Sequence, residues 1–150
     1  MVPTRIKISR EPNYYTHYIG RCDDGTQFMA LITATLPSPT PAHWQHHKRW
    51  YAVVHRFQAD GDHISTDARL IGVTADGEDE VVETARKARD EMLRKLGSLR
   101  FCDVTICQFS VEIHGSRFGL INTSDASRQQ LTLFPNDFVF RPPWDGSYDT

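Results

Sequence analysis

Most of the chain has the polar and apolar pattern of strands and turns, and only one long segment has a helical period. That segment runs from Glu78 to Gly97. At ~100° per residue its apolar side chains form one stripe, while acidic side chains fill the first turns and basic ones the later turns, opposing the helix dipole. The stripe contains Val81, Val82, Ala85, Ala88, Met92, Leu93 and Leu96. The pattern predicts one amphipathic helix, with Asp76 as its cap and Gly97 just past its end.

Runs rich in β-branched and aromatic residues surround this helix and predict strands. They cover residues 14–21, 27–36, 50–57 and 63–73 before the helix, and 103–113 and 116–122 after it. Turn signals, Asp-Gly twice and His-Gly once, lie between consecutive runs and predict three hairpins. Ile6 and Ile8 suggest a short edge strand, and residues 131–140 suggest one more C-terminal strand, broken by Pro135.

Strands joined by tight hairpins are antiparallel, so the predicted fold class is α+β. We expect an antiparallel sheet of about six or seven strands in the order ββββαββ, with one long helix packed on one face. Residues 1–150 form one domain by length. The run Gln27–Leu36 is apolar at nearly every position, which predicts a central strand with both faces covered. The second face therefore needs a cover, from the long loop before Trp50, the aromatic tail or a second subunit.

The amino-acid composition and the net charge fit a folded protein, and they argue against nucleic acid and a membrane as partners. Charged residues make up 24% of the chain and hydrophobic ones 39%, which is ordinary for a globular domain. A net charge of −2 gives no electrostatic reason to expect nucleic acid. No apolar run approaches the ~20 residues that cross a bilayer, and the first residues lack the apolar core of a secretory signal. The three cysteines cannot all pair within the chain, so we expect reduced thiols and a cytoplasmic location.

The loop from His43 to Trp50 has the most unusual composition. It holds three of the seven histidines and two of the three tryptophans. His43, His46 and His47 suggest a metal or hydrolytic site, because histidines three positions apart can face one ion on a helical turn. No HExxH, CxxC or HxH motif accompanies them, so we assign no metal. The competing interpretation is an exposed loop whose tryptophans fold back onto the sheet.

The same loop can also be interpreted as a recognition surface, because Trp, Tyr and Arg most often anchor protein interfaces. Tyrosines on the first predicted strand would extend that surface, although Tyr also favours ordinary strand packing. The predicted partner-binding residues are Tyr14, Tyr18, Trp44, His46, His47, Arg49 and Trp50. Stacking of single-stranded nucleic acid on this loop is a third interpretation, which the missing basic stripe opposes.

Motifs of known catalytic chemistry are missing from the sequence. Ser116 lies between two glycines, but the spacing is not that of a G-x-S-x-G nucleophile elbow. The glycine-rich loops that cradle phosphate do not occur, and Asp60-Gly61-Asp62 lacks the ligand ladder of a calcium loop. We therefore assign no catalytic residue and no cofactor.

Arg89 is the one charged residue on the apolar stripe of the predicted helix. Its stem could pack on the sheet while its guanidinium reaches water. The sharper hypothesis is a half-buried arginine paired with a carboxylate from the sheet, Glu112 or Asp103.

Together these patterns predict a non-enzymatic module that binds a protein partner, or a second copy of itself, through the aromatic surface. No membrane partner is expected. The alternative function is a small metal-dependent or hydrolytic enzyme built on His43, His46 and His47.

Overall fold

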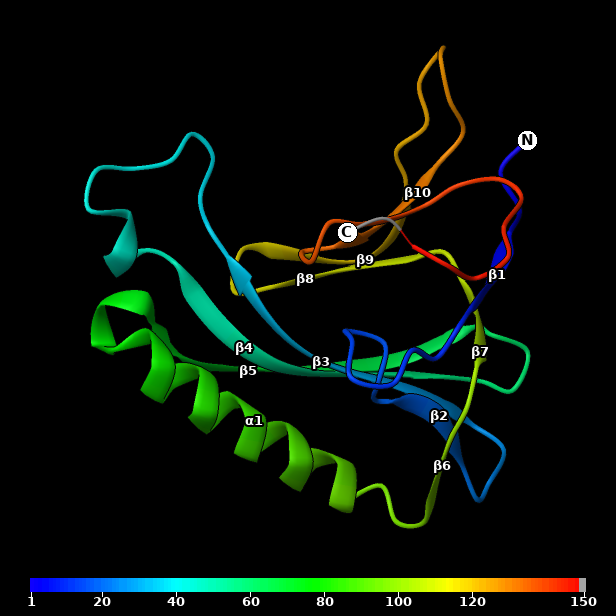
Figure 1. Cartoon of the computed structure of the whole chain (residues 1–150), viewed down its shortest axis with the longest axis horizontal. Helices are drawn as coiled ribbons and strands as arrows, with labels where there is room; N and C mark the ends of the chain where they lie inside the picture. Colours follow the sequence, from blue (N-terminus) through cyan, green and yellow to red (C-terminus); the bar gives the residue numbers. More distant parts are fainter. Residues whose placement is uncertain (149–150) are drawn as a thin grey trace.

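The computed structural model describes residues 1–148 and has three layers (Figure 1). Helix α1 (Glu78–Arg94) covers one face of a five-stranded antiparallel sheet, and a four-stranded antiparallel sheet lies over the other face. A two-stranded ribbon lies at one side of these layers. Strand β5 and strand β6 are the two edges of the larger sheet, so α1, which connects them in sequence, crosses the sheet from edge to edge.

In spatial order, the larger sheet consists of β5 (His63–Val73), β4 (Arg49–Phe57), β3 (Gln27–Thr35), β2 (Ile19–Cys22) and β6 (Leu99–Phe101). The smaller sheet consists of β11 (Phe138–Phe140), β10 (Leu131–Phe134), β9 (Ser116–Asn122) and β8 (Phe109–Ile113). The ribbon consists of β1 (Arg5–Ile8) and β7 (Val104–Cys107). Two short 3₁₀ turns are η1 (Trp44–His46) and η2 (Thr74–Asp76).

The predicted α+β class, with antiparallel sheets and one α-helix, is confirmed for the described residues. The predicted single sheet of six or seven strands is wrong, because residues 1–148 form eleven strands in three sheets. One difference is that the run 103–113 does not form a single strand: β7 ends at Cys107 and β8 begins at Phe109, with Gln108 between them. The alternating run 103–113 is therefore two strands in two sheets, β7 against β1 and β8 against β9.

Strand β3 is buried on both faces, as its continuous apolar pattern predicts. Phe28 packs with Met92 of α1 on one side. Met29 packs on the other side in a larger cluster that draws on all three sheets. The chain thus covers the second face with its own second sheet, and Trp144 and Tyr148 of the tail pack against the same cluster. The cluster comprises Ile6, Ile8, Ile19, Met29, Leu31, Phe57, Val104, Ile106, Phe109, Leu120, Leu131, Leu133, Phe138 and Phe140.

Helix α1 begins where the acidic pattern predicts it, at Glu78, and ends at Arg94. The residue that precedes it is Gly77, while the Asp76 carboxylate accepts a hydrogen bond from the backbone of Val73 in the turn before the helix. Gly97 has φ 91°, the left-handed conformation expected after a helix end. The predicted hairpins β2–β3, β4–β5 and β8–β9 are all present.

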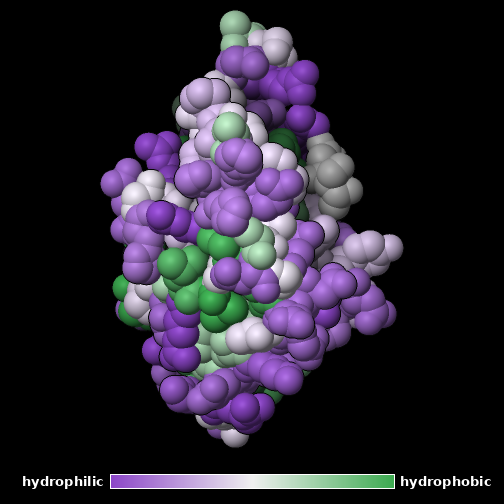
Figure 2. Space-filling view, turned by 90° about the vertical axis from the view of Figure 1, so that its left-hand side faces the viewer, coloured by the Kyte–Doolittle hydropathy of each residue, from purple (hydrophilic) through white to green (hydrophobic). Residues whose placement is uncertain are grey.

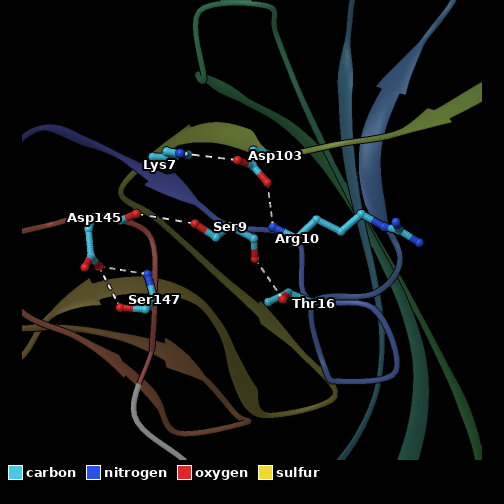
Figure 3. A network of polar contacts seen from close by, with 7 residues as sticks. All are labelled: Lys7, Ser9, Arg10, Thr16, Asp103, Asp145 and Ser147. Carbon is cyan, nitrogen blue, oxygen red and sulfur yellow. Dashed lines mark hydrogen bonds and ion pairs between the residues drawn. The ribbon is translucent and has the colours of Figure 1, made fainter.

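The first predicted strand is mostly wrong, because residues 12–18 form turns and only Ile19–Cys22 is strand. Asn13 has φ 69°, and the backbone N–H of His17 donates to the carbonyl of Tyr14. Thr16 is buried, and its hydroxyl accepts from the backbone of Glu11 while donating to the carbonyl of Ser9 (Figure 3). Local side-chain hydrogen bonds of this kind compete with sheet pairing, and here they hold a turn.

A network of polar contacts ties this turn to both ends of the chain (Figure 3). Asp103 forms an ion pair with Lys7 at 3.3 Å and accepts the backbone N–H of Arg10 at 2.7 Å. The Ser9 hydroxyl donates to the carbonyl of Asp145 in the tail. These contacts fix the base of the turn against the connection between β6 and β7.

The imidazole ring of His55 lies inside the molecule. His55 of β4 is 1% exposed, and its Nδ1 lies 2.7 Å from the hydroxyl of Thr66. That hydroxyl also lies 2.8 Å from Nε2 of His63. Within residues 1–148 the Nε2 of His55 has no hydrogen-bond partner, and its ring packs on Phe109 at 5.0 Å between centroids. Burial, with a smaller contribution from His63, lowers the pKa of His55 to about 3.

Candidate functional site

Side chains from the 12–18 turn and from the middle of α1 enclose a hollow of about 580 Å³. We call this the tyrosine hollow. Its lining residues are Asn13, Tyr14, Tyr15, His17, Tyr18, Arg86 and Arg89. Tyr14 is 65% exposed and Tyr15 56% exposed, which is high for large aromatic side chains. The lining includes two arginines and no carboxylate, and each arginine is paired with a carboxylate outside the lining, Arg86 with Glu83 at 3.5 Å and Arg89 with Asp90 at 3.1 Å.

The inner wall of the tyrosine hollow is held rigidly. The guanidinium of Arg89 lies 3.9 Å from the centre of the Tyr18 ring, in cation–π geometry, and its side chain is only 11% exposed. Asp90 fixes the guanidinium from one side, with an ion-pair distance of 3.1 Å. Arg89 is thus half-buried, as predicted, but its carboxylate partner is the neighbouring Asp90 instead of Glu112 or Asp103.

We expect Arg89→Ala to lower the free energy of unfolding by about 1 kcal/mol, through loss of the Tyr18 contact and of the packed stem. The Asp90 side chain is 48% exposed, so water solvates its carboxylate once the arginine is removed. Urea unfolding measures the change. The matched control is Arg86→Ala, whose side chain is 57% exposed and which should cost at most about 0.5 kcal/mol. Equal losses in the two variants would contradict the stacked geometry.

The loop from His43 to Trp50, hereafter the tryptophan loop, is pinned to the start of α1. The Nζ of Lys48 lies 5.9 Å from the Trp44 ring centre and 5.0 Å from the Trp50 ring centre, and it pairs with Glu78 at 3.8 Å. The indole N–H of Trp50 donates to the hydroxyl of Thr74 at 2.9 Å. Trp50 is therefore half-buried and structural, while Trp44 remains 38% exposed.

The predicted partner-binding residues do not share one surface. Tyr14 and Tyr18 line the tyrosine hollow, whereas His47 and Arg49 line a different cleft beside the β8–β9 hairpin. Figure 1 shows the tryptophan loop at the left edge of the molecule and the 12–18 turn over its middle. The partner-binding role of these residues stays a prediction, and the residues themselves lie in separate regions of the molecule.

The three histidines of the tryptophan loop, His43, His46 and His47, are exposed. Nowhere in residues 1–148 do three or more His, Cys, Asp or Glu side chains gather in a way that could hold a metal ion. A metal-dependent or hydrolytic enzyme built on these histidines stays a prediction without a supporting cluster. Two other histidines, His55 of β4 and His63 of β5, each contact the hydroxyl of Thr66.

Comparisons of the chain with protein-family models, with curated proteins and with solved structures found no match.

The face at the left of Figure 1 carries hydrophobic residues gathered near its middle, with hydrophilic residues around them (Figure 2). Exposed apolar side chains near this end of the sheets are Leu36, just after β3, and Leu70, which pairs with Tyr51 near the start of β4, at 40% and 45% exposure. Isolated exposed apolar side chains are ordinary on a protein surface.

In residues 1–148 no helix is long and apolar enough to span a membrane.

Sequence reasoning missed His17 and Arg86 as neighbours of the tyrosines. Nothing in the sequence places the 12–18 turn beside α1, because that contact depends on β2 lying next to β6 in the sheet. A feature of the sequence that could have grouped the two arginines is their spacing of three residues, which puts Arg86 and Arg89 on one side of a helix.

Proposed function

We propose that this chain is a non-enzymatic protein-binding module that docks a partner in the tyrosine hollow. The observation that carries the proposal is the exposure of Tyr14 and Tyr15, at 65% and 56%, beside two arginines in a lining without a carboxylate. Tyrosine and arginine are the side chains most enriched at interface hot spots, because they bury a large area and also form directed polar contacts.

The rigidity of the inner wall favours binding. Tyr18 and Arg89 are already stacked in the free chain, so they lose little conformational freedom when a partner covers them. Tyr14 adds only two rotatable side-chain torsions, which keeps the entropic cost of its ordering low. A preorganised aromatic floor of this kind supports specific recognition of a short segment.

The charge of the lining indicates the chemistry of the partner. Arg86 and Arg89 face the hollow, while the carboxylates beside them, Glu83 and Asp90, are not part of the lining. We propose a partner segment with an aspartate or glutamate next to an apolar side chain, the first bound by guanidinium and the second by tyrosine rings. The partner is a different protein, and both are cytoplasmic, in keeping with the free cysteines of this chain.

Photo-crosslinking tests this proposal. With a photoreactive amino acid in place of Tyr15, irradiation in a native lysate should yield one dominant crosslinked protein. Arg86→Ala combined with Tyr14→Ala should reduce that crosslink about tenfold, since both changes remove interface anchors. The matched control is Lys95→Ala, an exposed cation just past the last turn that lies outside the hollow and should leave the crosslink intact. An undiminished crosslink in the double variant would contradict the proposal, and a chain-to-chain crosslink would replace the partner with a second copy.

A further inference from the structure

A second concave region lies between the long loop after β3, the start of β4 and the β8–β9 hairpin, at the left of Figure 1. We call it the basic cleft. Its volume is about 720 Å³, within the usual ~300–1,000 Å³ of small-molecule sites. Phe134 at the end of β10, with Pro135 and Asp137 from the turn that follows, also lines it. It shares no lining residue with the tyrosine hollow.

Basic side chains dominate the polar part of this cleft. Arg49, Arg117, His47 and His114 line it, against a single carboxylate, that of Asp137. Across residues 1–148 neither arginine forms an ion pair. The Glu112 residue opposite Arg117 in the hairpin register is not part of the lining. Two guanidinium groups in one cleft without a compensating ion pair favour an anionic ligand.

The hairpin tip that carries Arg117 into the cleft is held in place by its turn and by its contacts with β4. His114 and Gly115 have φ 52° and 76°, which is the left-handed pair of a two-residue hairpin turn. The His114 ring stacks on Tyr51, a fully buried residue, with centroids 6.1 Å apart. Arg49 reaches across from β4, and its Nη1 donates to the carbonyl of His114 at 3.4 Å. The cationic wall is therefore anchored on two sheets before any ligand binds.

The lining of the cleft also has an apolar part. It consists of Leu36 and Pro37 from the long loop, Phe134 at the end of β10 and Pro135 just after it. A ligand that fills the cleft therefore needs an anionic end and an apolar body. Thr35, Ser38 and Ser116 also belong to the lining, and their hydroxyl groups can donate to an anion.

We propose that the basic cleft binds a small organic phosphate monoester, with the phosphate between Arg49 and Arg117 and the organic part against Phe134 and Pro135. A phosphate monoester carries about −1.5 to −2 charges at neutral pH and offers three acceptor oxygens. Two guanidinium forks match that charge and geometry better than they match a single carboxylate. The site is independent of the partner-docking function proposed above.

Titration with phenyl phosphate, followed by calorimetry, tests this site. Wild-type protein should bind it, and Arg49→Gln and Arg117→Gln should each weaken binding at least about tenfold, because each removes a charge-assisted hydrogen-bonding fork. Arg69→Gln is the matched control: Arg69 is a half-exposed arginine of β5 outside the cleft, and its replacement should leave the affinity unchanged.

Two further probes separate the parts of the site. Inorganic phosphate should bind more weakly than phenyl phosphate, because it leaves the apolar part of the lining uncovered. Phenol should not bind, because it lacks the anion. Equal affinity for the two phosphates would overturn the role of Phe134 and Pro135. No measurable binding of phenyl phosphate, or binding that survives both arginine substitutions, would overturn the proposal as a whole.

Discussion

Replacing Gly20 with alanine is expected to lower the free energy of unfolding by about 3 kcal/mol. Gly20 lies in β2, between Phe28 of β3 and Phe101 of β6. A Cβ atom at this position would overlap the carbonyl oxygen of Arg100 and would lie 2.9 Å from the Cα of Phe101. The obstructing atoms belong to the backbone, so relief requires the β6 strand to move away from β2.

The control for this substitution is Gly25→Ala in the β2–β3 turn. Gly25 has φ 87°, and no atom lies within 4 Å of the place that a Cβ would take, so the cost is backbone strain alone, about 1 kcal/mol. Guanidinium unfolding of both variants gives the comparison directly. If Gly20→Ala loses no more than Gly25→Ala, then β6 approaches β2 less closely than the structure shows.

The second large effect is a loss of stability in mild acid, caused by His55. Burial lowers its pKa to about 3 in the folded chain, whereas the unfolded chain binds the proton near the ordinary value of 6.5. Between these values the unfolded state binds more protons, so the contribution of His55 to stability is complete above pH 6.5 and falls as pH decreases toward 3. At pH 5 the loss amounts to about 2 kcal/mol relative to pH 7.

The loss of stability that His55 causes in mild acid can be separated from the effect of titrating carboxyl groups. Hydrogen bonds and nearby cations lower the pKa of Asp24 and Asp103 from 3.8, so their effects on stability begin below the range from pH 7 to pH 5. Urea unfolding at half-unit steps across that range isolates the histidine contribution. His63, whose pKa is also lowered by partial burial, adds to it in the same direction.

The variant that identifies His55 as the source is His55→Phe. Phenylalanine fills the ring space against Phe109, and the hydroxyl of Thr66 keeps its contact with His63. Its free energy of unfolding should change much less between pH 7 and pH 5 than that of the wild type. His43→Gln, at an exposed position, should retain the full wild-type change. A wild-type pH dependence in His55→Phe would show that another group is responsible.

Local patterns in the sequence predicted the elements of the fold more accurately than their arrangement. The helix from Glu78 could be predicted because its apolar stripe and its charge order are properties of consecutive residues. The same holds for the three hairpins, whose turns need glycine at a left-handed position and are visible within four residues. These features depend on no distant contact.

The position of the β1–β7 ribbon could not be predicted, because it depends on contacts between distant residues. Gln27 illustrates this: it is fully buried in β3, where its side chain donates to the carbonyl oxygens of Gln58 and Thr105 and accepts the backbone N–H of Thr105. A glutamine at a strand start is usually a surface residue. Only the position of β7 explains its burial.

The same distinction, between local sequence patterns and contacts of distant residues, applies to the candidate sites. Composition alone predicted Tyr14 and Tyr18 as interface residues, because tyrosine often anchors protein interfaces, and that role stays a prediction. Composition could not show that Arg86 would line the same hollow, or that Arg49 and Arg117 would line one cleft. Residues brought together by sheet packing leave no spacing signal along the chain.

The pairing of β1 with β7 has a consequence for synthesis. Ile6 and Ile8 belong to the main apolar cluster, but their strand partners are Ile106 and Val104. At about 5–20 residues per second, a ribosome adds those partners roughly 5–20 s after the first strand. Throughout that interval the β1 backbone and its two isoleucines lack their native partner strand. A translating chain therefore presents this amino-terminal segment to chaperones well before it can fold.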